Sequence, residues 1–422
     1  MNTELSENNS DRNIRALVAI CVLVYIAAYV GRLSYTSSMV GIMEATGTTK
    51  DIAGLVSTFF YLSYGTGQLV NAFFCRRYNP RPVIAGIMLV SGASNLLAFI
   101  VRSVPVIRFI WFVNGAAQSA LWCTVIELLS HRIPPERKRG AILAMSSTST
   151  IGTALIYSLS AFCIGVGHVF WIFAIAAILL GGTAAAWLLV TRRLREMPDY
   201  AASAQAVSGD ASDKPAARPH SQWSILAAAW VMVLTMGMMA IGNGFIRDTM
   251  VTWIPSLLYD RFGMPSSASV VITLVLPLFS LAGAFLGVTL HKKIRGTAIP
   301  LSILFTMSAA ALGGVYLSYR LHSMIPVILF SGLNGCIMAS VNNFITSIIP
   351  LEQGEGAGLF AGVMDAFCYV GSTVSGFLPG LILERYAPRG FDILLPALPV
   401  LALLLVGFSI AAAFGERRRK QR

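Results

Sequence analysis

Residues 14–36 read IRALVAICVLVYIAAYVGRLSYT, an apolar run with charge only at Arg15 and Arg32. As an α-helix, a run of about 23 residues is roughly 35 Å long, enough to cross a hydrocarbon core of ~30 Å. Arg32 lies deep in the run. Its guanidinium stays protonated at any workable pH, and a charge at mid-bilayer depth costs roughly 2.5–3.5 kcal/mol. The stretch therefore predicts a membrane-spanning helix. Because burying the Arg32 charge costs free energy, we expect that charge to have a function.

Similar runs recur along the chain. Hydrophobic residues make up 56% of the 422 residues, charged residues only 12%, and the mean hydropathy is +0.71. A soluble protein carries about twice that charged fraction. We therefore predict an all-α polytopic membrane protein with twelve transmembrane helices. The expected spans are 14–36, 52–74, 82–101, 105–130, 139–163, 168–194, 223–258, 267–290, 297–318, 323–350, 356–383 and 392–415.

The net charge of +12 follows the same pattern. Basic residues gather in alternate loops, which indicates orientation by the positive-inside rule rather than binding to nucleic acid. We expect a multi-pass protein of the cell inner membrane with both termini in the cytoplasm. The basic clusters are Arg76/Arg77/Arg81, Arg132/Arg137/Lys138/Arg139, Arg192/Arg193/Arg195, Lys292/Lys293/Arg295 and Arg417–Lys420.

Residues 196–222, EMPDYAASAQAVSGDASDKPAARPHSQ, contain no apolar run. Their Ala, Ser, Asp and Pro content is typical of a flexible linker, here predicted to be cytoplasmic. The chain then divides into an N-terminal six-helix bundle, residues 1–195, and a C-terminal six-helix bundle, residues 223–422.

The two predicted bundles repeat one another. Arg32 and Arg247 are the two arginines deep in apolar runs, and they lie 215 residues apart in sequence. Matches at nearly one offset favour duplicated bundles, a parallel repeat whose substrate site lies at the midplane between the halves. Two further pairs match: Arg76-Arg77 with His291-Lys292, and Asn114-Gly115 with Asn334-Gly335.

A set of motifs is spread over most of the chain. In chain order they are Tyr25, Tyr29 and Arg32; Tyr64-Gly65; Asn79-Pro80-Arg81; Asn114-Gly115, Gln118 and Trp122; Arg247, Trp253 and Pro255; and Tyr369 and Gly371. Together these motifs resemble the organophosphate:phosphate antiporter family of the major facilitator superfamily, which includes glycerol-3-phosphate and hexose-phosphate transporters. The resemblance implies the major facilitator fold and makes Arg32 and Arg247 the two residues that bind a phosphate from opposite halves.

The chemistry of an arginine pair agrees with this implication. A guanidinium fork matches a tetrahedral oxyanion bidentately, and two fixed positive charges in a low-dielectric cavity attract an anion strongly. Repulsion between the arginines in an empty cavity would favour exchange over net transport. The alternative is that each arginine snorkels to the membrane surface or belongs to an internal ion pair, for which Asp248 is an obvious partner of Arg247. The predicted substrate-binding residues are Arg32, Arg247, Tyr25, Tyr29, Tyr64, Gln118, Trp122, Ser149 and Tyr369.

The chain also departs from the family pattern. Leu33 stands where the family often has a lysine after the first arginine, and Gln68 replaces a second lysine. Ser149 aligns with the histidine associated with substrate binding. Thr252 and Leu276 occupy positions of expected acidic residues. Loss of a buried cation allows its buried acidic partner to be lost as well. The identity of the anion, including whether it is phosphorylated, is left open.

Three acidic residues are candidates for coupling or gating: Glu127, Asp248 and Asp365. Glu127 either carries a proton or binds a substrate ammonium, or it is a helix-end carboxylate beside His131-Arg132. Asp248 either pairs locally or lines the cavity. Asp365 follows a glycine-rich stretch and is a possible gate residue. A proton-coupled symporter, or a drug or sugar exporter, that uses Glu127 or Asp365 is therefore an alternative function.

Enzyme signatures are absent from the sequence. It holds no GxxxxGK[ST] phosphate loop, no HExxH and no metal-spaced Cys/His cluster, so we expect neither an enzyme nor a cofactor or metal. We predict a monomeric secondary transporter in the lipid bilayer. It would exchange a small organic anion, an organophosphate, for phosphate or a related anion by rocker-switch alternating access. A transport-dead sensor of a phosphorylated ligand is a further alternative.

Overall fold

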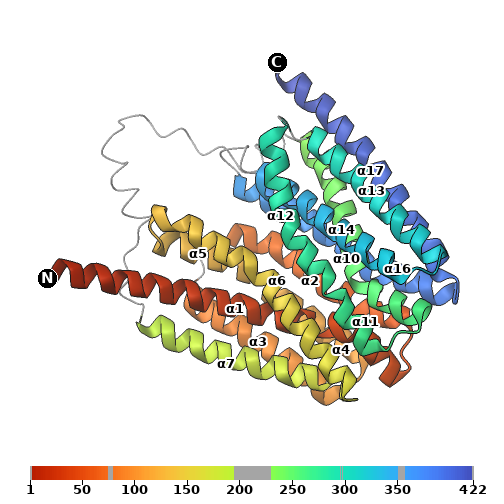
Figure 1. Ribbon diagram of the computed structural model, residues 1–422. Helices are drawn as coiled ribbons and strands as arrows, with labels where there is room; N and C mark the ends of the chain where they lie inside the picture. The colour runs from red at the N-terminus through yellow and green to blue at the C-terminus, as the bar shows by residue number, and fades with distance from the viewer. Residues whose placement is uncertain are drawn as a thin grey trace.

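The computed structural model describes residues 2–74, 79–193, 230–294, 296, 298–349 and 357–420. Within these ranges the chain forms helices and short connections, with no strand (Figure 1). The all-α prediction is confirmed. The predicted linker, 196–222, and the basic pair Arg76-Arg77 lie outside the described residues.

The helices form two sets in chain order. The first set holds α1 (Asn2–Thr46), α2 (Lys50–Phe74), α3 (Pro80–Val101), α4 (Val104–Gln118), α5 (Leu121–Arg132), α6 (Pro135–Gly165) and α7 (Trp171–Arg193). The second set holds α10 (Trp230–Phe262), α11 (Ser266–Thr273), α12 (Val275–Lys293), α13 (Ala298–Arg320), α14 (Met324–Asn343), the π-helical turn η2 (Phe344–Ile348), α16 (Ala357–Arg385) and α17 (Gly390–Lys420).

Ten helical stretches among the described residues are long and apolar enough to span a membrane. Three of them join consecutive elements: α4 with α5, α11 with α12, and α14 with η2. The remaining long helices, α2 and α10, add two passages to the ten, which gives the predicted twelve. Polar residues within such helices face the interior of the bundle or a cavity.

Local chemistry sets several helix boundaries. The side chain of Asn79 caps α3 by accepting a hydrogen bond from the backbone N–H of Arg81, and Pro80 occupies the first turn, where its missing N–H costs nothing. Gly263 ends α10 with φ of 64°, a left-handed conformation that favours glycine. The Asn79-Pro80-Arg81 motif therefore shapes the entry into α3.

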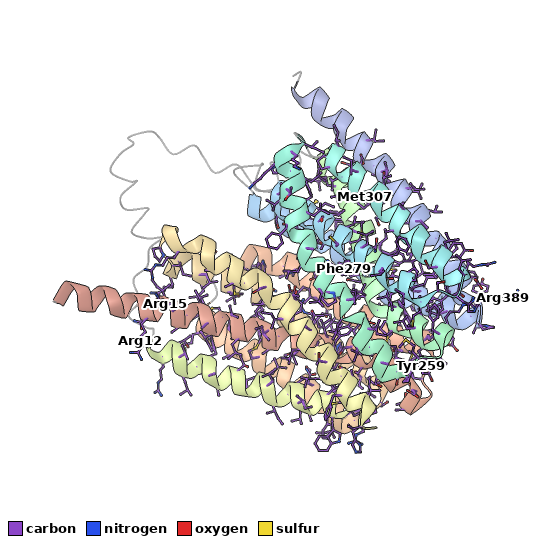
Figure 2. All side chains as sticks on the ribbon, viewed as in Figure 1. Arg12, Arg15, Tyr259, Phe279, Met307 and Arg389 are labelled. Atoms are coloured by element: carbon purple, nitrogen blue, oxygen red, sulfur yellow. The ribbon has the colours of Figure 1, made fainter. Side chains whose placement is uncertain are left out.

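Apolar side chains cover the outside of the bundle. Figure 2 shows Phe279 and Met307 on the second set of helices, where they are 36% and 41% exposed. Many other large apolar residues are exposed in the same way, such as Phe285 and Leu404. A continuous apolar exterior is stable in lipid and would aggregate in water, so this surface is the lipid-facing side of a multi-pass membrane protein.

The two sets share a repeated internal hydrogen bond. The Ser91 hydroxyl donates to the Asn114 carbonyl oxygen at 2.8 Å, and the Ser308 hydroxyl donates to that of Asn334 at 2.7 Å. Both bonds join the third and fourth passages of their set. This equivalence supports the duplication expected from the sequence, while the boundaries 1–195 and 223–422 remain a prediction.

The sets are closely joined at the end opposite to the chain termini, and they diverge toward the end that carries the termini (Figure 1). At the joined end, Lys50 of α2 forms an ion pair with Asp260 of α10 at 2.5 Å. The Lys50 backbone N–H donates to Glu384 of α16 at 3.0 Å, and the Ser266 hydroxyl donates to Glu44 of α1 at 2.6 Å. We call this set of contacts the closed end.

The helices α2 and α16 pack against each other from the closed end to the middle of the molecule. Glycines permit the close approach: a Cβ on Gly376 would lie 2.8 Å from the Gly54 carbonyl oxygen and 2.6 Å from the Thr58 hydroxyl. The Thr58 hydroxyl also donates to the Thr373 carbonyl at 3.0 Å. Contact between α2 and α16 is therefore a main seam between the two sets.

Candidate functional site

Arg32 lies in the middle of α1 and is only 7% exposed. Its Nε donates to the Gln118 side-chain oxygen at 3.4 Å. The guanidinium carbon lies 4.3 Å from the centre of the Tyr64 ring and 4.9 Å from that of Tyr29. None of the ion pairs in the described part of the chain includes Arg32. A cation supported by ring faces and an amide, rather than by a carboxylate, keeps its charge available for a ligand.

Gln118 is held in place by a buried amide network. It is fully buried in α4, and its Nε2 donates to the Ser91 hydroxyl at 2.8 Å and to the Asn114 side-chain oxygen at 3.0 Å. Asn114 in turn donates to the Gly31 carbonyl at 3.1 Å, beside Arg32. Since both amide hydrogens of Gln118 are used, its oxygen is the group left to face the guanidinium.

Arg247 lies in α10 and is bound by its neighbour. Its Nε and Nη2 donate to the two carboxylate oxygens of Asp248 at 2.8 and 3.1 Å, a bidentate pair. Its Nη1 donates to the Asn342 side-chain oxygen at 3.2 Å, and Asn243 donates to the same oxygen at 3.2 Å. The local ion pair that the sequence offered as an alternative for Arg247 is present in this conformation.

Asp365 lies in α16, partly buried, where α16 faces α2. It lies beside Gln68 of α2 and within electrostatic range of both Arg247 and Arg32. One turn farther along α16, the Tyr369 ring centre is 4.7 Å from that of Tyr64. The midpoint of the α2–α16 seam therefore brings together residues from both halves.

The structure groups the remaining aromatic candidates beside Arg32. Tyr25 is buried, and its ring centre lies 5.1 Å from that of Trp122 and 5.7 Å from that of Tyr29. Ser149 of α6 is half-buried and precedes Gly152 by one turn. At Gly152 a Cβ would lie 2.6 Å from the Tyr29 Cβ, so α6 packs directly on this cluster.

Glu127 lies elsewhere. It is in α5, where its carboxylate pairs with His131 one turn later at 3.2 Å, and both side chains are partly exposed. This geometry is that of a helix-end carboxylate beside a basic turn, the simpler of its two interpretations.

A hollow of about 720 Å³ lies between α1 and α6 toward the N-terminal end of the first set. Arg15, Val18 and Val22 of α1 line it, together with Arg137 and other residues of α6. Figure 2 shows Arg15 near this end of the molecule. The α1 residues of the hollow recur every three to four positions, a spacing that continues along the same helix face to Tyr25, Tyr29 and Arg32. One helix face thus connects the hollow with the buried arginine.

Sequence reasoning missed several residues of this region. Tyr61 lies within electrostatic range of Arg32, Arg247 and Asp248, and its ring centre is 6.1 Å from that of Tyr369. Asn243 shares the Asn342 acceptor with Arg247. Both are polar residues within predicted membrane spans, and that was the available signal.

Among the described residues, no group of three or more His, Cys, Asp or Glu side chains could hold a metal ion. The region instead presents guanidinium groups, tyrosine hydroxyls, side-chain amides and carboxylates around one point. Such groups recognise a polar solute through hydrogen bonds and charge.

Comparison with known proteins agrees with this architecture. The chain is 25% identical over 412 residues to a probable hexose phosphate transport protein of Chlamydia pneumoniae, which covers 90% of this chain and 88% of that protein. It is 23% identical over 386 residues to the probable sulfoacetate transporter SauU of Cupriavidus necator, with 87% of each covered. These relatives are membrane transport proteins, not enzymes.

A solved structure shows the same fold. It is a bacterial homologue of the human lysosomal transporter Spinster in an inward-facing and unoccupied conformation, with a TM-score of 0.68, 15% identity and 95% of each chain covered. The family model described as Major Facilitator Superfamily matches residues 21–376, most of the sequence. The chain belongs to the major facilitator superfamily of membrane transporters.

Proposed function

We propose that the protein exchanges an organophosphate-like anion for phosphate or a related anion across the cell inner membrane, and that Arg32 and Arg247 bind the anion. The observation that carries the proposal is the state of Arg32: a deeply buried guanidinium, supported by ring faces and one amide, without an ion-pair partner in the described structure. A charge kept in this way is costly unless a ligand uses it.

The relatives favour an oxyanion. One is named for a hexose phosphate and the other for sulfoacetate, and both compounds carry a tetrahedral oxyanion. The guanidinium fork fits phosphate and sulfonate oxygens equally well in shape. Tyr64 and Tyr369 supply hydroxyl groups and ring faces beside it, one from each half.

Alternating access follows from the arrangement of the halves. The positive-inside pattern puts both termini in the cytoplasm, which makes the closed end the outer end. The conformation then corresponds to an inward-facing state, in which the two sets diverge at the end that carries the termini (Figure 1). Rocking the halves about the site would separate α2 from α16 at the outer end. We expect a monomer to perform this cycle.

The test is counterflow in liposomes. Vesicles loaded with phosphate should take up external radiolabelled phosphate, and empty vesicles should not. Arg32→Lys keeps the charge but loses the fork, so we expect at least a tenfold loss of uptake, with Arg32→Gln lower still. Arg102→Gln is the control, because Arg102 is exposed at the end of α3. Wild-type exchange by Arg32→Lys would refute the arginine clamp.

Proton coupling is the second candidate, because Asp365 is a carboxylate within the site and Glu127 is not. A proton-coupled carrier would accumulate its solute in response to a pH gradient across vesicles that contain no counter-anion. Exchange requires the counter-anion and gives no accumulation from the gradient alone. The same vesicles identify a transport-dead sensor, which would bind the anion without any counterflow.

A further inference from the structure

The charged side chains of the candidate site balance one another. Four charged side chains meet there: the guanidinium groups of Arg32 and Arg247 and the carboxylates of Asp248 and Asp365. Two positive and two negative charges sum to zero. An oxyanion alone would therefore add negative charge to a site whose own charges balance, and a cationic group on the same ligand would offset part of that charge.

Arg247 is already engaged. Of the five N–H donors of a guanidinium, two are used by Asp248 and one by Asn342. The fork that would hold an oxyanion side-on is occupied by a carboxylate of the same shape. Arg247 can still offer an N–H to a ligand, but its charge is balanced.

The remaining two charges are opposite in sign and unpaired. Arg32 of α1 and Asp365 of α16 take part in none of the ion pairs found among the described residues. The neutral side chain of Gln68 lies beside Asp365. A cation on the first half and an anion on the second half, neither in an ion pair among the described residues, thus lie within electrostatic range of each other.

The surface between these two charges is aromatic. Tyr64 stands under the Arg32 guanidinium, and Tyr369 stacks obliquely on Tyr64 one turn from Asp365. A ring face attracts a positive group, and a carboxylate beside ring faces binds an ammonium group well. The Asp365 side of the site therefore suits a cation as clearly as the Arg32 side suits an anion.

From this arrangement we infer that the substrate is a zwitterion that carries a tetrahedral oxyanion at one end and an ammonium group at the other. The oxyanion binds Arg32 and the free N–H groups of Arg247, and the ammonium binds Asp365. Aminoalkyl phosphates, phosphonates and sulfonates have this chemistry. The inference rests on the proposed function for the anionic end and adds the cationic end.

The test compares ligands that differ only in the cationic group. Binding to the purified wild-type protein is measured by calorimetry with 2-aminoethylphosphonate and with propylphosphonate, in which a methyl group replaces the ammonium. We expect the amino compound to bind at least tenfold more tightly. Taurine against propanesulfonate repeats the comparison with a sulfonate, and phosphoethanolamine against propyl phosphate repeats it with a phosphate ester. The preferred pair identifies the oxyanion.

Variants then assign the preference to a residue. Asp365→Asn should reduce the preference for 2-aminoethylphosphonate to below threefold, and Asp365→Glu should restore most of it. Asp392→Asn is the control, because Asp392 pairs with Arg320 at 3.6 Å outside the site. If Asp365→Asn fails to fold, the wild-type ligand pairs alone decide the question.

The outcomes separate the two proposals. Equal affinity for amino and methyl ligands, both lost in Arg32→Gln, would overturn the zwitterion inference and leave anion binding intact. A preference for the amino compound that survives unchanged in a folded Asp365→Asn would also overturn it. Failure of every oxyanion to bind, or binding unaffected by Arg32→Gln, would remove the proposed function and the inference with it.

Discussion

The close packing of α2 on α16 predicts the effect of a single methyl group. In Gly376→Ala, the new Cβ would lie 2.8 Å from both the Gly54 carbonyl oxygen and the Thr58 backbone nitrogen, whereas ordinary contacts begin at 3.4 Å. The helices must separate locally by about 0.6 Å, and the Thr58 hydroxyl, only 2.6 Å from the new atom, must move away from Thr373. Overpacking of this kind costs typically 1–3 kcal/mol.

That cost applies only while the closed end is closed. A conformation in which α2 and α16 part at this end carries no such penalty, so the equilibrium should shift toward it by about 5- to 150-fold. The measurement is the distance between spin labels at Ala45 and Arg389, exposed positions on opposite halves at this end, in a cysteine-free background. We expect a new, longer distance population in Gly376→Ala, with slower exchange in liposomes.

A matched variant controls for helix propensity, because replacing glycine by alanine inside a helix stabilises it by roughly 0.5–1 kcal/mol on its own. Gly313→Ala in α13 supplies this term without a clash, since nothing lies within 4 Å of a Cβ there. If Gly376→Ala and Gly313→Ala give the same distance distribution as the wild type, α2–α16 contact does not control access at this end.

Three further predictions concern residues around the seam and the site. Lys50→Gln removes a partly exposed ion pair worth about 0.2–1 kcal/mol. The same spin labels should therefore show an increase of no more than about fivefold in the population of the open conformation. A larger increase would mean that the pair does more than contribute its charge. Asn342→Ala takes a hydrogen-bond acceptor from the charged Arg247, so stability should fall by about 1.5–3 kcal/mol in denaturant unfolding, and an unchanged midpoint would contradict the contact. Asn114→Leu should destabilise more than Asn334→Leu, because the Asn334 amide nitrogen has no partner among the described residues; thermal unfolding of the two variants side by side compares them.

The fold was predictable because the requirement that produces it acts within each helix separately. Lipid requires each passage to satisfy its own backbone hydrogen bonds, so an apolar run of about twenty residues already specifies a helix. Finer detail was not predictable in this way. The single expected span 105–130 is interrupted after Gln118, and the span 323–350 ends in a π-helical turn from Phe344 to Ile348. These interruptions depend on packing between helices rather than on hydropathy.

From the residues alone the site was predictable in its charges, and the family resemblance added its aromatic and amide residues. Arg32 and Arg247 stand out because a guanidinium in an apolar run is rare, and Asp248 is adjacent in sequence to its partner. The partners of Arg32 come from distant helices, and the ring contact between Tyr64 and Tyr369 joins residues about 305 positions apart. No pattern in one sequence relates such positions.

The partners of the two arginines alter the argument for exchange. Two bare guanidinium groups would repel each other in an empty cavity, which would prevent closure without substrate. Here Asp248 neutralises Arg247, and Asp365 lies within range of both arginines, so the empty site carries no excess positive charge. Repulsion therefore cannot be what couples closure to binding. The remaining imbalance is the separation of the unpaired Arg32 from the unpaired Asp365, and a substrate that bridges these two groups removes it. In the proposed cycle, the bridging of opposite charges across the seam, rather than the relief of like charges, makes the loaded carrier the one that closes.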